Sequence, residues 1–176
     1  LSTATGLADD RDEAGVYQWG RMTIKSGRGS ITMNGTSSEY SGVGFTDPVT
    51  DTDSGTKQLI MKSAKTSGTA IQITGLSTSG KGVSFNYLNP KEILSLGGGQ
   101  IIVNGTGGGA GNHGVSLQNQ DILSTSGDIF VTGIAGGVVL GDRGARFGSL
   151  SGSGITSSSA DLTIRGDVID YQNLLE

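Results

Sequence analysis

The stretch Ile101-Ile102-Val103-Asn104-Gly105-Thr106 decides the fold of this chain, because near copies of it recur along the sequence. The stretch Ile31-Thr32-Met33-Asn34-Gly35-Thr36 matches it closely, and looser copies begin at Ile71, Ile129 and Leu162. Repeats of this size indicate one structural unit that stacks on itself. They also argue against an enzyme, because the sequence varies around a scaffold and not around a site.

Each copy has the alternation of a β-strand. Its apolar side chains are separated by single residues, so they point to one face of the strand. The pairs that share this face are Ile31 and Met33, Ile71 and Ile73, Ile101 and Val103, and Ile129 and Val131. We expect the strand to stop at the following Asn-Gly or Thr-Gly, because glycine tolerates the positive φ that a sharp turn demands.

A second strand motif follows the first three copies. It occurs as Gly42-Val43-Gly44-Phe45, Gly82-Val83-Ser84-Phe85 and Gly114-Val115-Ser116-Leu117. Because Phe45, Phe85 and Leu117 fall at the same position of the unit, we expect them to form a vertical stack in or beside the core. A third short element follows in places, such as Ile93–Leu96 and Ile122–Ser124.

Stacked units of this kind predict an all-β fold, a parallel β-helix (β-solenoid) of roughly six coils. Insertions then bulge outward as loops, and residues 47–57 are expected to form one. We assign β-helix repeats to residues 28–166, a cap or degenerate first coil to residues 1–27, and a terminal strand or cap to residues 167–176. An immunoglobulin-like β-sandwich, in which the repeated strands would pair antiparallel, is the alternative fold.

The composition limits the classes of function. The chain has 176 residues, a net charge of −4 and only 12 Lys and Arg residues, with no run of them. Nucleic-acid binding requires a basic stripe that neutralises phosphates, so no nucleic-acid partner is expected. No stretch approaches the ~20 apolar residues of a membrane helix, so membrane insertion is not expected either. The sequence has no Cys, which excludes disulfides, zinc–thiolate sites and thiol catalysis.

The strongest metal candidate is the acidic segment with Asp47, Asp51 and Asp53. Calcium prefers several oxygen ligands, and Asp-x-Asp with a following Gly55 can supply them. The segment departs from the EF-hand frame, because Gly55 lies one place early and Lys62 takes the place of the closing Glu. An ordinary acidic loop is the alternative to calcium binding, and no other cofactor is expected.

Catalytic side chains are not indicated. The only His, His113, lies in a Gly-rich loop, where we expect a solvent-facing turn residue. Polysaccharide-cleaving β-helices need clustered carboxylates, or an Arg or Lys base, on one face. Asp121, Asp128 and Asp142 do not share the phase that would stack them into such a set. We interpret the nearby basic residues as turn residues that keep the surface wet; they are Arg143 and Arg146.

Three segments resemble the repeats of filamentous-haemagglutinin-type exoproteins: residues 126–133 (Ser-Gly-Asp-Ile-Phe-Val-Thr-Gly), the Gly-rich residues 105–112 and the strand at residues 114–117. The resemblance covers roughly residues 28–166. It implies a right-handed parallel β-helix in a very long secreted or surface-attached bacterial protein, exported by a two-partner route and active in adhesion, biofilm or cell contact. The amino-terminal secretion domain of that family is not visible here. We expect the chain to be an excerpt of a longer protein or a processed product.

The combined expectation is a structural or adhesive β-helical segment of a large secreted or cell-surface bacterial protein, without enzyme activity. Its partners would be neighbouring repeats of the same protein or identical copies, which join end to end as a filament through edge strands. Glycans or proteins of a host or cell surface are further expected partners. The alternative function is a carbohydrate-binding or polysaccharide-degrading β-helix, which a cluster of Asp, Arg and Tyr on one lateral face would favour.

Overall fold

The computed structural model describes residues 15–19, 22–46, 59–86, 91–110, 112–118, 120–137, 143–148, 155–166 and 169–172. These residues form strands and turns and no helix. Sheet A consists of β1 (Val16–Trp19), β4 (Val43–Thr46), β7 (Val83–Asn86), β10 (Val115–Gln118), β13 (Ala145–Gly148) and β16 (Ile169–Gln172). Sheet B consists of β2 (Met22–Ser26), β5 (Leu59–Ser63), β8 (Lys91–Ser95), β11 (Gln120–Ser124) and β14 (Ile155–Ser157). Sheet C consists of β3 (Ile31–Ser37), β6 (Thr69–Ser77), β9 (Gln100–Thr106), β12 (Ile129–Ile134) and β15 (Leu162–Gly166).

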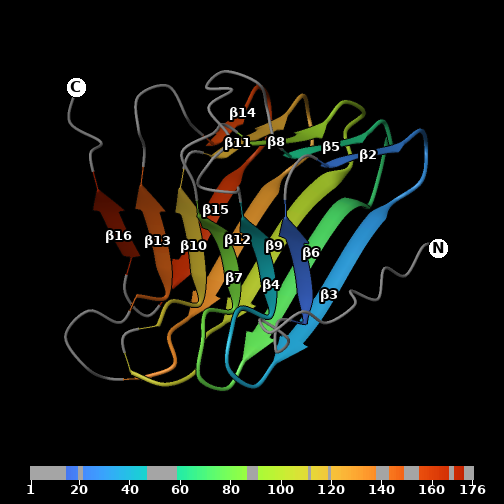
Figure 1. Ribbon diagram of the computed structural model, residues 1–176. Coiled ribbons are helices and arrows are strands. Elements are labelled where there is room, and N and C mark those ends of the chain that lie inside the picture. The colour runs from blue at the N-terminus through green and yellow to red at the C-terminus, as the bar shows by residue number, and fades with distance from the viewer. Residues whose placement is uncertain are drawn as a thin grey trace, which may run out of the picture.

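Every strand pair in the described residues is parallel, and each strand pairs with the strand three places further along the chain. The chain therefore visits sheets A, B and C in turn, and we call one such passage a rung. Figure 1 shows the stacked strands, with β3 toward one end of the molecule and β16 at the other. This arrangement fits the predicted parallel β-helix. It excludes the immunoglobulin-like sandwich, whose strands would pair antiparallel.

The register of sheet C confirms the sequence repeat. Ile101 pairs with Ile71 on one side and with Ile129 on the other, and Ile31 and Leu162 extend the same column. The next apolar position forms a second column, made by Met33, Ile73, Val103, Val131 and Ile164. Burial alternates along β9 and β12 as the sequence pattern predicts, so both columns point into the interior.

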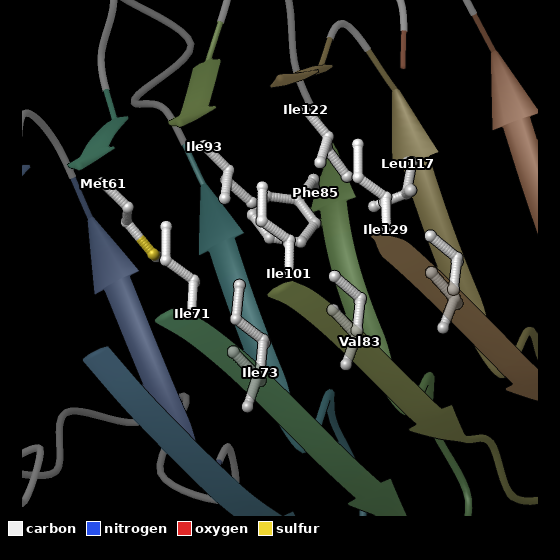
Figure 2. Close-up of a cluster of buried hydrophobic side chains, with 14 of the residues drawn as sticks. Met61, Ile71, Ile73, Val83, Phe85, Ile93, Ile101, Leu117, Ile122 and Ile129 are labelled. Atoms are coloured by element: carbon white, nitrogen blue, oxygen red, sulfur yellow. The ribbon is translucent and has the colours of Figure 1, made fainter. Parts of the chain in front are cut away.

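The interior is filled by apolar columns from all three sheets. Phe45 pairs with Phe85 and Phe85 with Leu117 in sheet A, which confirms the predicted stack. The rings of Phe45 and Phe85 are buried, with centroids 4.6 Å and planes 17° apart. Aromatic pairs of this kind contribute about 0.5–1.5 kcal/mol beyond the burial of their area. Figure 2 shows these columns converging; those labelled from sheets B and C are Met61, Ile93 and Ile122, and Ile71, Ile73, Ile101 and Ile129.

One prediction about the repeat is wrong. Gly75 and Gly105 do not end their strands with a positive φ, because β6 continues to Ser77 and β9 to Thr106. Among the described glycines, positive φ occurs at Gly68, Gly98 and Gly109. The repeat glycine is needed for a close approach instead, since a Cβ on it would overlap the carbonyl oxygen of the glycine before the following sheet A strand. The pairs are Gly35 with Gly42, Gly75 with Gly82, Gly105 with Gly114, and Gly133 with Gly144.

Serines hold the corners between sheets B and C, a feature that the sequence patterns did not predict. The last residues of the sheet B strands form one column of serines: Ser26, Ser63, Ser95, Ser124 and Ser157. Ser95 is fully buried, and its Oγ donates to the carbonyl of Gly99 at 2.6 Å. Ser124 Oγ accepts the N–H of Gly127 at 2.9 Å. Because a buried hydroxyl is costly without such partners, these hydrogen bonds favour one shape of the corner.

The connections from sheet B to sheet C have nearly the same length in every rung, whereas those from sheet A to sheet B do not. Between sheets B and C they have four or five residues in every rung: residues 27–30, 64–68, 96–99, 125–128 and 158–161. Between sheets A and B they range from one residue to twelve: residues 20–21, 47–58, 87–90, 119 and 149–154. The predicted outward loop at residues 47–57 lies outside the described residues. The caps assigned to residues 1–27 and 167–176 stay predictions; within those ranges, β1, β2 and β16 pair in register with the sheets.

Candidate functional site

The predicted calcium ligands Asp47, Asp51 and Asp53 lie outside the described residues. Within the part of the chain that the structure describes, no group of three or more His, Cys, Asp or Glu residues could hold a metal ion. Calcium binding by the acidic segment therefore stays a prediction.

Carboxylates do meet on the outer face of sheet B, in a pair that the sequence phase did not reveal. Asp121 pairs with Glu92 in the register of β11 and β8. Glu92 is buried, and its Oε1 lies 2.6 Å from Lys62 Nζ on β5. A buried carboxylate is stable only beside a compensating charge, and Lys62 supplies it. This ion pair accounts for Glu92 as a structural residue.

Asp128 has its own counterpart one rung later. It lies directly before β12, and Asp161 holds the same place before β15. Asp128 Oδ1 accepts the backbone N–H of Asp161 at 3.3 Å, and its Oδ2 accepts the side-chain amide of Gln100 at 3.4 Å. Asp121 thus stacks on Glu92, and Asp128 stacks on Asp161. Asp121 and Asp128 do not stack on each other. Asp142, the third predicted surface carboxylate, lies outside the described residues.

A polar column lies on the outer face of sheet A. Because Val83 and Phe85 point into the core, the residue between them, Ser84, points outward. Its column, here called the outer column, contains Gly44, Ser84, Ser116 and Arg146, and the register extends it to Tyr17 at one end and Asp170 at the other. Ser84 is 7% exposed and Ser116 is fully buried, although both face away from the apolar interior. Buried hydroxyls on an outer face distinguish this region from an ordinary solvated sheet surface.

A second column, here called the corner column, lies beside the outer column. It consists of the residues two places before β4, β7, β10 and β13: Ser41, Lys81, His113 and Arg143. Backbone hydrogen bonds fix its register, since the N–H of Gly82 donates to the carbonyl of His113 at 3.1 Å and that of Gly114 to the carbonyl of Arg143 at 3.0 Å. The two columns are in contact through His113 and Arg146, whose Nε2 and Nη1 lie 3.3 Å apart.

His113 is not the solvent-facing turn residue that the sequence predicted. It is 7% exposed, and its Nε2 lies 3.3 Å from Nη1 of Arg146. A guanidinium only donates hydrogen bonds, so the imidazole Nε2 accepts here, which requires the neutral ring with its proton on Nδ1. Arg146 is part-buried in this contact, so it is not a wet turn residue either. Both predictions were wrong because the contact between His113 and Arg146 depends on how β10 and β13 align, and the connection before a sheet A strand differs in length between rungs.

Lys81 belongs to the same cluster. Burial lowers the pKa of its ammonium group, and the positive charge of Arg146 lowers that pKa further. Lys81, His113, Ser116 and Arg146, drawn from both columns, therefore place two cations, an imidazole and a buried hydroxyl in one region of the outer face of sheet A. We call these four residues the basic cluster.

The carboxy-terminal end of the stack exposes side chains that belong to core columns. Leu162 is 43% exposed, whereas Ile129, its partner one rung earlier, is fully buried. Ile169 is 38% exposed, whereas Ala145, its partner in sheet A, is fully buried. The difference follows from position alone, because each core column is covered by the next rung and no further described rung covers these two.

Comparison with known proteins gives no relative: no family model, no curated protein and no solved structure matches this chain. In the described residues, no helix has the length and apolar character needed to cross a membrane.

Proposed function

We propose that this chain is a structural and adhesive β-helical segment of a large secreted or cell-surface bacterial protein. In this role the rungs form a stiff rod, and further rungs of the same kind continue it at its ends. These rungs come either from identical copies that join end to end or from neighbouring repeats of the same protein. Connections between sheets A and B differ in length from rung to rung, and they would display contacts for glycans or proteins of a host or cell surface.

The observation that carries the proposal is the exposed end of the apolar columns. Leu162 and Ile169 continue columns whose earlier members are fully buried, so another rung stacked on them would remove apolar surface from water. Sheets A, B and C also end in strands with one described neighbour each. Such edges present backbone N–H and C=O groups that a further parallel strand can pair with.

The proposed helix is right-handed, with about six coils, one for each strand of sheet A. About 98% of crossover connections between parallel strands of one sheet are right-handed, which supports that hand. With strands about 4.8 Å apart, the coils would rise only about 30 Å. A rod of useful length therefore requires more rungs than this chain supplies.

Negative-stain electron microscopy and small-angle X-ray scattering over rising protein concentration test end-to-end assembly. We expect filaments, or particles that lengthen along one axis, for the unmodified chain. The variant Leu162→Lys places a charge on the end of a core column and should abolish the lengthening.

The matched control is Leu96→Lys. Leu96 is 52% exposed but lies in a corner between sheets B and C in the middle of the stack, so its charge should leave assembly unchanged. A compact particle of constant size at every concentration would exclude end-to-end assembly of copies. Equal loss of assembly in both variants would exclude the end face as the contact.

A further inference from the structure

The basic cluster is built from a repeated geometric step. His113 in the corner column contacts Arg146, which lies in the outer column one rung later. The same step from Lys81 leads to Ser116, because Val83 pairs with Val115. By register, Lys81 thus holds the same place relative to Ser116 as His113 holds relative to Arg146, and the two pairs lie in adjacent rungs.

Two members of the cluster, Lys81 and Ser116, are costly for a purely structural surface, even though Asp170 follows Arg146 in the register of sheet A. Like charges repel more strongly where water is excluded, and burial itself disfavours an ammonium ion. Both effects act on Lys81, whose pKa is lowered by burial and then by Arg146. In addition, Ser116 Oγ is buried and has no hydrogen-bond partner within the described residues. A hydroxyl in that situation loses hydration without compensation unless another group reaches it.

We propose that Lys81, Ser116 and Arg146 bind an oxyanion group, a carboxylate, sulfate or phosphate, on a ligand that docks against the outer face of sheet A. The guanidinium fork of Arg146 matches such a group, Lys81 adds a compact positive charge, and Ser116 Oγ donates a third hydrogen bond. His113 is a positioning residue, since its Nε2 accepts from Arg146 and orients the guanidinium. This site is independent of the end faces and of rod assembly.

Isothermal titration calorimetry of the full chain with glucuronate, inorganic sulfate and inorganic phosphate, in separate titrations, tests the site. We expect saturable binding of at least one of the three anions with one site per chain. Preference for glucuronate would assign a carboxylate, as carried by an acidic sugar or an acidic side chain. Preference for sulfate or phosphate would assign a tetrahedral group. Absence of saturable binding for all three anions would overturn the proposal.

Matched substitutions separate a built site from general charge attraction. Lys81→Gln and Arg146→Gln should each weaken binding by at least about tenfold, because each removes a charge-assisted hydrogen bond. Lys25→Gln also removes one positive charge, at an exposed position of β2, and should leave affinity unchanged. Equal weakening by Lys25→Gln and Lys81→Gln would overturn the proposal.

Three further variants guard against loss of folding as the explanation. Ser116→Ala removes only a hydroxyl and should weaken binding while leaving the unfolding midpoint unchanged or higher. For the positioning residue, His113→Phe should weaken binding and His113→Gln, which keeps a hydrogen-bond acceptor, should restore much of it. An anion affinity that stays the same in all of these variants would show that the anion binds elsewhere, and it would overturn the proposed site.

Discussion

The charged form of Lys81 lowers the free energy of unfolding, because burial and a neighbouring positive charge both disfavour it. Its side chain is partly buried, and the positive charge of Arg146 adds repulsion, so the pKa of its ammonium group falls below the ordinary 10.5. A lowered pKa means that the folded state disfavours the charged form. Lys81 therefore weakens the fold at neutral pH, which fits a binding residue better than a scaffold residue.

We predict that Lys81→Met raises the free energy of unfolding near neutral pH, and that this gain shrinks as the pH approaches 10.5. Between the lowered folded pKa and that value the unfolded chain holds the Lys81 proton more tightly than the folded chain does. The free energy of unfolding of the unmodified protein therefore rises with pH across this interval. It falls over the same interval as the pH is lowered toward the folded pKa. Urea unfolding near pH 7 and near pH 10.5 measures the difference. Lys25→Met is the exposed control, and a gain that is independent of pH would contradict the prediction.

At the scale of the element, paired glycines let four of the five described sheet C strands approach the start of the next sheet A strand. The contact recurs in four rungs, so the interior narrows at the same place each time. A side chain there would meet backbone atoms, which cannot move aside as the end of a flexible side chain can. The glycines of the repeat are therefore packing residues of the strand and not turn residues.

We predict that Gly75→Ala destabilises the protein by about 1–3 kcal/mol, the usual cost of forcing extra volume into a packed interior. Its Cβ would overlap the carbonyl oxygen of Gly82 and press on Cγ2 of Val83. Gly27→Ala is the matched control, because a Cβ on Gly27 meets nothing within 4 Å. Denaturant midpoints compare the two variants, and equal midpoints would show that the chain can open this corner freely.

The strand columns were predictable from sequence, because alternation and repeat spacing together determine which apolar residues stack. The pairing of Ile71 with Ile101 and the Phe45–Phe85 stack follow directly from that rule. The basic cluster was not predictable in the same way. His113 and Arg146 lie 33 positions apart, and they meet only because β10 and β13 align across a connection longer than those of the earlier rungs. The sequence does contain a serine at the end of each sheet B strand. Its role in fixing the corner becomes clear only once the structure shows that the hydroxyl is buried.

At the scale of the whole molecule, the described strands of each rung pair only with strands of the rungs directly before and after it. Stability in such a stack is close to a sum of rung and interface terms. The end rungs have one described neighbour each, so they should open at lower free energy than the middle of the stack. Exposed Leu162 and Ile169 belong to this weaker end.

Native-state hydrogen exchange checks this gradient with two amides that are otherwise alike. The N–H of Ile101 donates to the backbone carbonyl of Asp128 at 3.0 Å. The N–H of Ile129 donates to the backbone carbonyl of Asp161 at 2.9 Å, next to the last described strand of sheet C. We predict that the amide of Ile129 exchanges at least about tenfold faster, because its acceptor strand opens first. Equal protection of both amides would mean that the rungs open together as one cooperative unit.

The unequal connections also affect how such a protein can change over generations. A residue gained inside a strand would turn the buried side chains after it outward, because the side-chain period of a strand is two. A residue gained in a connection need not do so: Ser95 and Ile101 lie six positions apart, Ser124 and Ile129 lie five apart, and both residues of each pair still align between neighbouring rungs. Mutations that lengthen the chain should therefore accumulate in the connections and not in the strands. Foreign peptides grafted for display should be placed in the connections as well.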